Sequence, residues 1–237
     1  MSSAEAKPFY EPSTIPFSEQ RSDLRAGIGR RVGEQLDSTP GLWRLSSSRD
    51  RPVQLYLRGN FLSAEVCAQL CGQIDAGNYP SPLYEKDKYA GARTSHSCNL
   101  NIYDQQVSQV ETQIADLLGM EKGWAEPLQG QRYEVGQEFR QHSDFFYVDQ
   151  PYWPEYESHG GQRTWTAMIY LNQPGGGGAT QFPLLDLAVQ PQPGRLLIWN
   201  NMAADGSPNP WTLHAGLPVE AGTKYIITKW YRERTFS

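Results

Sequence analysis

Hydrophobic residues in the first half of the chain recur every three or four positions, which is the period of an amphipathic helix. After Ser63, a residue type suited to cap a helix, such a run extends to Gly77, and a second run extends from Asp104 to Gly119. A shorter helical pattern lies within residues 21–50. The pattern predicts two helices packed on one outer face of the protein, preceded by an N-terminal layer with some helical character.

Beyond residue 127 the pattern changes to short runs typical of strands, separated by glycine, proline or asparagine. A similar run over residues 53–59 precedes the first of the two helices. Roughly eight runs follow, over residues 131–135, 138–146, 163–171, 180–184, 187–191, 194–200, 211–215 and 223–231. Short strands at this spacing favour a sandwich or a barrel, of which the jelly roll is one closed form. We therefore expect an α+β protein whose core is built from strands.

The length of 237 residues suits one well-buried domain, because single β-rich domains often reach about 200–250 residues. Residues 1–20 are rich in proline, serine and glutamate, a composition typical of a loosely ordered arm. We expect an N-terminal arm and short helical layer over residues 1–50 and a single domain over residues 51–237. Within that domain, residues 79–97 are polar, aromatic and rich in turn residues, and a loop of this length often acts as a lid or binding element.

Charge and composition exclude several classes of function. The chain carries 21 Lys and Arg against 26 Asp and Glu, a net charge of −5, whereas nucleic-acid-binding modules are typically basic. No stretch approaches the ~20 apolar residues of a membrane helix, and the N-terminus as written has no secretory signal. Cys67, Cys71 and Cys98 are too few for a disulfide scaffold. We expect neither a nucleic-acid nor a membrane partner, and a reducing, cytoplasmic location.

The candidate chemistry lies at two of the four histidines. His142 and Asp144 are two residues apart in a predicted strand, and such residues project from the same face. Asp144 precedes Phe145 and Phe146, where an unpaired carboxylate would be costly and a cation would relieve the cost. His214 lies in another strand-like run and is the best candidate for a third ligand. Two histidines and one carboxylate suit non-haem Fe(II), and they also suit Zn²⁺ with a bound water.

Two local interpretations stay open at this point. His142 could instead form a hydrogen bond within a sheet while Asp144 caps a turn. Lys224 stands ten residues after His214 at the start of an apolar strand, where a buried lysine needs an anion. A dicarboxylic acid that chelates the metal at one end would present its other carboxylate to such a group. The alternative is an edge lysine that extends its ammonium to solvent.

Six stretches of the chain together resemble the prolyl 4-hydroxylases of the iron(II)- and 2-oxoglutarate-dependent dioxygenase superfamily. They are RTS (93–95), RYEVGQEFRQHSDFF (132–146), GGQRTWTAMIYLN (160–172), GGGGATQFP (175–183), GRLLIWN (194–200) and HAGLPVEAGTKYIITKWYRE (214–233), and the resemblance covers roughly residues 55–236. It implies a double-stranded β-helix (jelly-roll) core with N-terminal helices packed on one face. It also implies His142, Asp144 and His214 as catalytic iron ligands and Lys224 as the ion-pair partner of the distal carboxylate of 2-oxoglutarate.

The same resemblance implies further site residues and an activity. Tyr133, Thr180 and Tyr170 would bind the cosubstrate, although each could also be a buried strand residue with a satisfied hydroxyl. Positions matching the groove for a proline-containing peptide are Arg93, Ser95, Glu126, Arg163 and Trp230. The implied reaction hydroxylates proline in a peptide or protein, decarboxylates 2-oxoglutarate to succinate and CO2, and needs Fe(II), O2 and ascorbate as reductant.

The sequence departs from the family pattern at a few positions. Ala179 stands where glutamate is common, Phe139 where tyrosine is common, and Arg232 where histidine is common. Phe139 and Arg232 lie on the peptide side that the resemblance implies, which leaves the same chemistry on a free amino acid or small metabolite as an alternative. A non-catalytic, cupin-like metal-binding protein is a second alternative. The pattern carries no signal for an oligomeric state.

Overall fold

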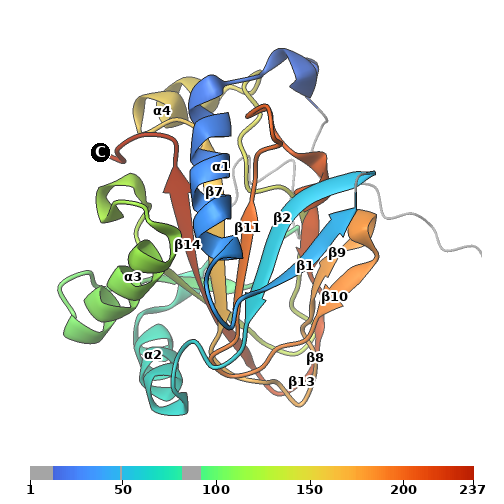
Figure 1. The fold of residues 1–237 in the computed structure, drawn as a ribbon. Coiled ribbons are helices and arrows are strands. Elements are labelled where there is room, and N and C mark those ends of the chain that lie inside the picture. The colour runs from blue at the N-terminus through green and yellow to red at the C-terminus, as the bar shows by residue number, and fades with distance from the viewer. Residues whose placement is uncertain (1–12, 49, 82–91) are drawn as a thin grey trace, which may run out of the picture.

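The computed structural model describes residues 13–48, 50–81 and 92–237 of the chain (Figure 1). The α-helices in this part are α1 (Asp23–Asp37), α2 (Ala64–Gly77), α3 (Gln105–Leu118) and α4 (Trp153–Ser158). The strands are β1 (Trp43–Ser48), β2 (Arg51–Arg58), β3 (Tyr79–Pro80), β4 (His96–Asn99), β5 (Gln129–Tyr133), β6 (Phe139–His142), β7 (Arg163–Tyr170), β8 (Gly176–Gly177), β9 (Thr180–Phe182), β10 (Leu187–Val189), β11 (Leu196–Asn200), β12 (His214–Gly216), β13 (Val219–Ala221) and β14 (Lys224–Arg232). None of the described helices combines the length and apolar character needed to cross a bilayer.

The strands form two larger antiparallel sheets that face each other. The major sheet has the order β1-β2-β11-β7-β14-β5-β4-β3, and the minor sheet has the order β10-β9-β12-β6. The pair β8 and β13 makes a third, two-stranded sheet. Side chains of both larger sheets meet in one apolar cluster that includes Met168, Phe182, Leu197 and Trp199. This two-sheet core is the predicted jelly roll, and the predicted α+β layout is confirmed.

The other face of the major sheet is covered by α1, α2 and α3 (Figure 1). Strand β7 shows why both faces are apolar: Trp165 and Ile169 pack toward the helices, while Met168 and Tyr170 belong to the cluster between the sheets. The larger core thus lies between the helices and the major sheet. The site residues lie on the opposite face of that sheet, which the helices do not reach.

Helix boundaries follow from capping residues that the sequence displays. The Ser63 hydroxyl accepts a hydrogen bond from the Val66 amide at the start of α2, and Asp104 caps α3 in the same way. Gly119 ends α3 with a φ of 60°, a left-handed conformation that glycine adopts without strain. The two predicted helices are therefore confirmed, and α1 joins them on the same face.

Other segments differ from the sequence pattern. The run predicted as a strand over 138–146 ends at His142, and the run over 211–215 begins with a 3₁₀ turn before β12. The strands β1, β3, β4, β8 and β13 and the helix α4 were not predicted. The shortest of them, β3 and β8, have two residues each, too few to show a period. Of the loop predicted over 79–97, residues 82–91 lie outside the described residues. The division at residue 50 stays a prediction, and β1 and β2 pair across it.

Candidate active site

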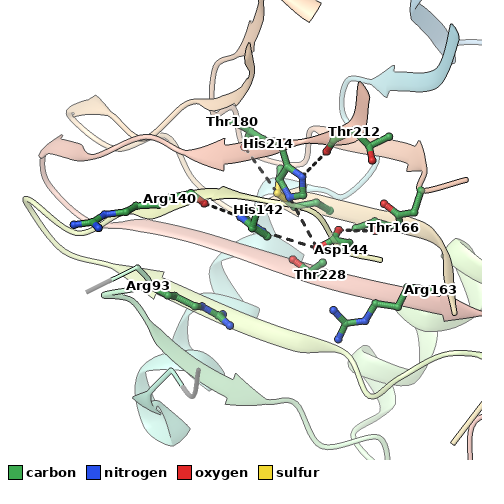
Figure 2. Close-up of polar contacts among 12 residues, drawn as sticks. Arg93, Arg140, His142, Asp144, Arg163, Thr166, Thr180, Thr212, His214 and Thr228 are labelled. Atoms are coloured by element: carbon green, nitrogen blue, oxygen red, sulfur yellow. Dashed lines mark hydrogen bonds and ion pairs between the residues drawn. The ribbon is translucent and has the colours of Figure 1, made fainter. Parts of the chain in front are cut away.

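Strand pairing brings His142, Asp144 and His214 to one point between the sheets. Strand β12 pairs with β6 so that His214 lies opposite His142, and Asp144 follows β6 two residues later. The Nε2 atoms of His142 and His214 lie 3.9 and 4.0 Å from Asp144 Oδ1. One potential ligand atom from each residue lies within 4.8 Å of the others, and Figure 2 shows the three side chains turned toward one another.

Hydrogen bonds fix which imidazole nitrogen faces the carboxylate. His142 Nδ1 lies 2.8 Å from the carbonyl of Arg140, and His214 Nδ1 lies 2.9 Å from the carbonyl of Thr212. A carbonyl can only accept, so each Nδ1 donates to it and each Nε2 is left as the nitrogen that faces Asp144. Burial, and then the neighbouring His214, hold the pKa of His142 well below its usual range. The His142 ring is thereby prepared as a neutral ligand.

This arrangement fits a metal ion. Asp144 is only 5% exposed, and among the described residues no lysine or arginine lies within ion-pair distance of its carboxylate. A buried carboxylate and two imidazole nitrogens therefore converge at one point, and a cation bound there would offset the cost of burying the carboxylate. Two imidazoles and one carboxylate form the donor set that non-haem Fe(II) accepts.

A pocket that is partly open to solvent extends from these three residues to Lys224. Its remaining lining residues are Gln131, Tyr133, Phe139, Met168, Thr180, Trp199, Gly216, Ile226, Thr228 and Trp230. Lys224 is 1% exposed, its Nζ lies 5.0 Å from the centre of the Tyr133 ring, and no described carboxylate pairs with it. Burial lowers the pKa of Lys224 to about 7. Such a buried amine is suited to bind an anion that enters the pocket.

The predicted cosubstrate residues differ in their access to this pocket. Tyr133 lines it and donates a hydrogen bond of 2.7 Å to Gln131 Oε1. Thr180 also lines it, whereas Tyr170 is absent from the lining and contacts the Thr180 hydroxyl at 2.6 Å. Tyr170 thus lies behind the pocket wall, where it contacts Thr180 and its ring centre lies 5.7 Å from Lys224 Nζ.

Among the predicted peptide-side residues, Arg93 and Ser95 lie on one flank of the ligand triad. Arg93 donates to the hydroxyls of Ser95 and Ser97 and to Gln129 Oε1, each at 3.0 Å. Its guanidinium stands 4.9 Å from the centre of the Phe139 ring, and that ring stacks on His142. Figure 2 shows Arg93 and Arg163 on either side of the triad.

The other flank is held together by Glu126. Its carboxylate accepts two hydrogen bonds of 2.6 Å from Arg163 and lies 2.7 Å from Arg232 Nε. The Arg163 guanidinium in turn stands 4.2 Å from the centre of the Trp230 ring and 4.9 Å from that of Phe146. Glu126 therefore holds Arg163 in place, and the buried Arg232, which departs from the family pattern, is part of the same cluster.

The sequence reasoning missed several pocket residues. Gln131 connects Tyr133 to Thr228, whose hydroxyl accepts a 3.2 Å hydrogen bond from Gln131 Nε2. Thr166 donates to Asp144 Oδ2 at 2.7 Å. The available signal was strand alternation, which places Gln131 in β5, Thr166 in β7 and Thr228 in β14 on inward-facing positions.

Comparisons with known proteins agree with this geometry. A sequence model described as the 2OG-Fe(II) oxygenase superfamily matches residues 128–232. The chain is 37% identical over 144 residues to prolyl 4-hydroxylase subunit alpha-1 of Rattus norvegicus, a match that covers 60% of this chain and 27% of that protein. It is 30% identical over 259 residues to probable prolyl 4-hydroxylase 8 of Arabidopsis thaliana, covering 97% of this chain and 87% of that one.

Among solved structures, the chain resembles the viral collagen prolyl hydroxylase of Paramecium Bursaria Chlorella virus-1 in its 2OG complex. The TM-score is 0.58 at 27% identity, covering 74% of this chain and 94% of the viral one. The chain spans about a quarter of the length of the animal alpha-1 subunits that it matches.

Proposed function

The chain belongs to the prolyl 4-hydroxylase family of the 2OG-Fe(II) oxygenase superfamily, and we propose on this premise that it hydroxylates proline residues in a peptide or protein. The family uses Fe(II), 2-oxoglutarate and O2. The observation that supports the proposal is a single pocket with a buried His-Asp-His triad at one end and a buried lysine at the other. In this proposal His142, Asp144 and His214 hold the iron, and Lys224 binds the distal carboxylate of 2-oxoglutarate.

Each residue then has a definable task. Bound iron would use the oxidative decarboxylation of 2-oxoglutarate to succinate and CO2 to activate O2 for insertion of one oxygen atom into a C–H bond. Tyr133 and Thr180, whose side chains line the pocket, would contact the cosubstrate from the pocket wall. Lys224 would fix the orientation of 2-oxoglutarate, because an ion pair in a buried site is strong and has a defined direction.

The peptide side follows from the aromatic and arginine residues beside the triad. Trp230 lines the pocket and is backed by Arg163, so that its ring offers a rigid apolar surface for a pyrrolidine ring. Proline-rich segments bind such aromatic-lined grooves because their extended helix is already ordered. We also propose ascorbate as the reductant and, from the three free cysteines, a cytoplasmic location.

The proposal is tested by incubating the protein with a short proline-rich peptide, Fe(II), ascorbate, 2-oxoglutarate and air, followed by mass spectrometry. The expected result is a gain of one oxygen on proline that requires 2-oxoglutarate. Succinate without peptide oxidation would redirect the same chemistry to a free amino acid or small metabolite. Neither product from iron-loaded protein would favour the non-catalytic metal-binding alternative.

Replacing Glu126 with glutamine should weaken peptide binding without affecting the cosubstrate. Glutamine has one acceptor oxygen, so the substitution keeps at most one of the two hydrogen bonds from Arg163 and turns an NH2 donor toward the guanidinium; we expect the KM for peptide to rise about tenfold. The KM for 2-oxoglutarate should stay unchanged. Glu134→Gln is the matched control, since Glu134 pairs with Arg132 at an exposed site where an ion pair contributes little. Equal effects of both substitutions would contradict this role for Glu126.

The KM for 2-oxoglutarate should depend on pH through Lys224. Below pH 7 its amine is already protonated, whereas at higher pH a proton must be taken up to pair with the dicarboxylate. We therefore expect the KM to rise with pH above 7, by up to about tenfold per pH unit. In Lys224→Arg the guanidinium remains charged throughout, so the KM of this variant should stay flat. A wild-type KM that stays constant between pH 6.5 and 8.5 would contradict the prediction.

A further inference from the structure

A chain of two hydrogen bonds ends on the carboxylate of Asp144. Asn201 Nδ2 donates to Thr166 Oγ1 at 2.9 Å, and Thr166 Oγ1 donates to Asp144 Oδ2 at 2.7 Å. Figure 2 shows Thr166 reaching Asp144 from the side away from His142. Thr166 and Asn201 are both fully buried, so water cannot replace either bond.

The chemistry of the threonine hydroxyl fixes the direction of this chain. A hydroxyl has one hydrogen, and Asp144 Oδ2 as a carboxylate oxygen can only accept it. If the Asn201 amide were reversed, its oxygen would face the same hydroxyl, and one hydrogen could not serve two acceptors. The Nδ2 group must therefore face Thr166, which ensures that the hydroxyl donates to Asp144.

With Nδ2 turned toward Thr166, the side-chain oxygen of Asn201 is left without a partner. In the part of the chain that the structure describes, Asn201 Oδ1 is buried and has no hydrogen-bond partner. An unpaired buried acceptor costs about 1–3 kcal/mol. A buried polar group without a hydrogen-bond partner in a folded protein calls for an explanation, and a role in holding a functional site in place is one. The orientation of Asn201 is explained by what its other end does for Asp144.

The two residues stand on rigid supports. Thr166 lies in β7, between β11 and β14 in the middle of the major sheet, opposite Trp199 on one side and Trp230 on the other. Asn201 directly follows β11, its amide donates to the Thr164 carbonyl at 2.8 Å, and its carbonyl accepts from the Asn209 amide at 2.9 Å. Backbone bonds on both sides thus hold Asn201 where it meets Thr166.

We propose that Thr166 and Asn201 are positioning residues that present one oxygen of Asp144 to the metal. The hydrogen bond from Thr166 occupies Oδ2, while Oδ1 is the oxygen that faces both histidine Nε2 atoms. Asp144 is thereby held as a ligand through a single oxygen before any metal binds. This inference rests on the proposed function of the triad. It assigns part of the triad's affinity for the metal to Thr166 and Asn201, which are not themselves ligands.

The test measures Co(II) binding, since Co(II) accepts the same donors as Fe(II) and can be followed by its visible absorption. Thr166→Val keeps the shape and removes the donor, and it should weaken Co(II) binding about 10- to 100-fold, the usual effect of losing an outer-shell partner. Thr166→Ser restores the hydroxyl and should recover most of the wild-type affinity. Asn201→Ala should weaken binding less, because Thr166 can still donate.

The matched control is Thr164→Val. Thr164 is a buried threonine two residues away on the same strand, but its hydroxyl bonds to the carbonyls of Tyr231 and Arg232. The inference is overturned if Thr166→Val binds Co(II) as wild type does, or if Thr164→Val weakens binding equally. Should Thr166→Val fail to fold by circular dichroism, wild-type affinity in Asn201→Ala overturns it instead. His214→Ala distinguishes failure of this inference from failure of the proposed function. If this variant binds Co(II) like wild type, the metal centre and the proposed function are wrong.

Discussion

Replacing Asp144 with asparagine should reduce 2-oxoglutarate turnover to the background of metal-free protein while leaving the fold intact. The carboxylate is the anionic member of the triad, and two neutral imidazoles alone would hold Fe(II) poorly. Asparagine has the same shape, so its oxygen can still accept from Thr166. Its amide nitrogen would then face the Nε2 atoms of His142 and His214.

The folded state of metal-free Asp144→Asn should be as stable as that of wild type, or more so. A buried carboxylate without a bound cation is unfavourable, and a neutral amide in its place removes this cost. Functional sites commonly trade stability for activity in this way. Thermal unfolding followed by circular dichroism gives one measurement, and succinate formation gives the other.

The control for this experiment is His159→Ala. His159 is an exposed histidine at the end of α4, where its ring contacts Ser158 and a backbone carbonyl, and it lies outside the triad. Its removal should leave turnover and Co(II) binding unchanged. Retention of full activity by Asp144→Asn would sink the metal assignment, whereas a collapse of the fold in that variant would show that Asp144 serves stability.

The sequence pattern predicted the three triad residues, but the predicted placement of two of them on one strand was only partly correct. It placed His142 and Asp144 on one face of a single strand, whereas β6 ends at His142 and Asp144 lies beyond it. The groups still converge because β12 pairs with β6 and brings His214 opposite His142. The residue types and their order were readable, but the pairing between strands far apart in the chain was not.

The fold was predictable where local signals were strong and unpredictable where contacts are long-range. The helices α2 and α3 have caps and a full apolar face within one continuous segment, so the pattern could define them. The hydrogen bonds between Asn201 and Thr166 and between Arg163 and Glu126 join different segments, and the spacing of these residues in the sequence does not predict them. Polar residues that act through another residue are found only once the sheet register is known.

Replacing Lys224 with methionine should raise the KM for 2-oxoglutarate about 30-fold or more, since losing one partner of a buried, hydrogen-bonded charge pair costs about 2–5 kcal/mol. The same substitution should stabilise the free protein. In the described part of the chain Lys224 has no carboxylate partner, so its ammonium is desolvated without compensation until an anion binds. Methionine fills a similar volume without that cost.

Lys229 provides the contrast on the same strand. It is also buried, but its ammonium pairs with the buried carboxylate of Glu111 on α3. Lys229→Met leaves that carboxylate uncompensated and should destabilise the protein by about 3–5 kcal/mol, while the KM for 2-oxoglutarate of the remaining folded protein stays unchanged. Opposite shifts in the unfolding temperatures of the two variants, with a raised KM for 2-oxoglutarate only in Lys224→Met, would show that Lys229 stabilises the fold and that Lys224 binds a ligand. If Lys224→Met instead lowered the unfolding temperature and left the KM unchanged, Lys224 would be a structural residue and the cosubstrate would have to bind elsewhere.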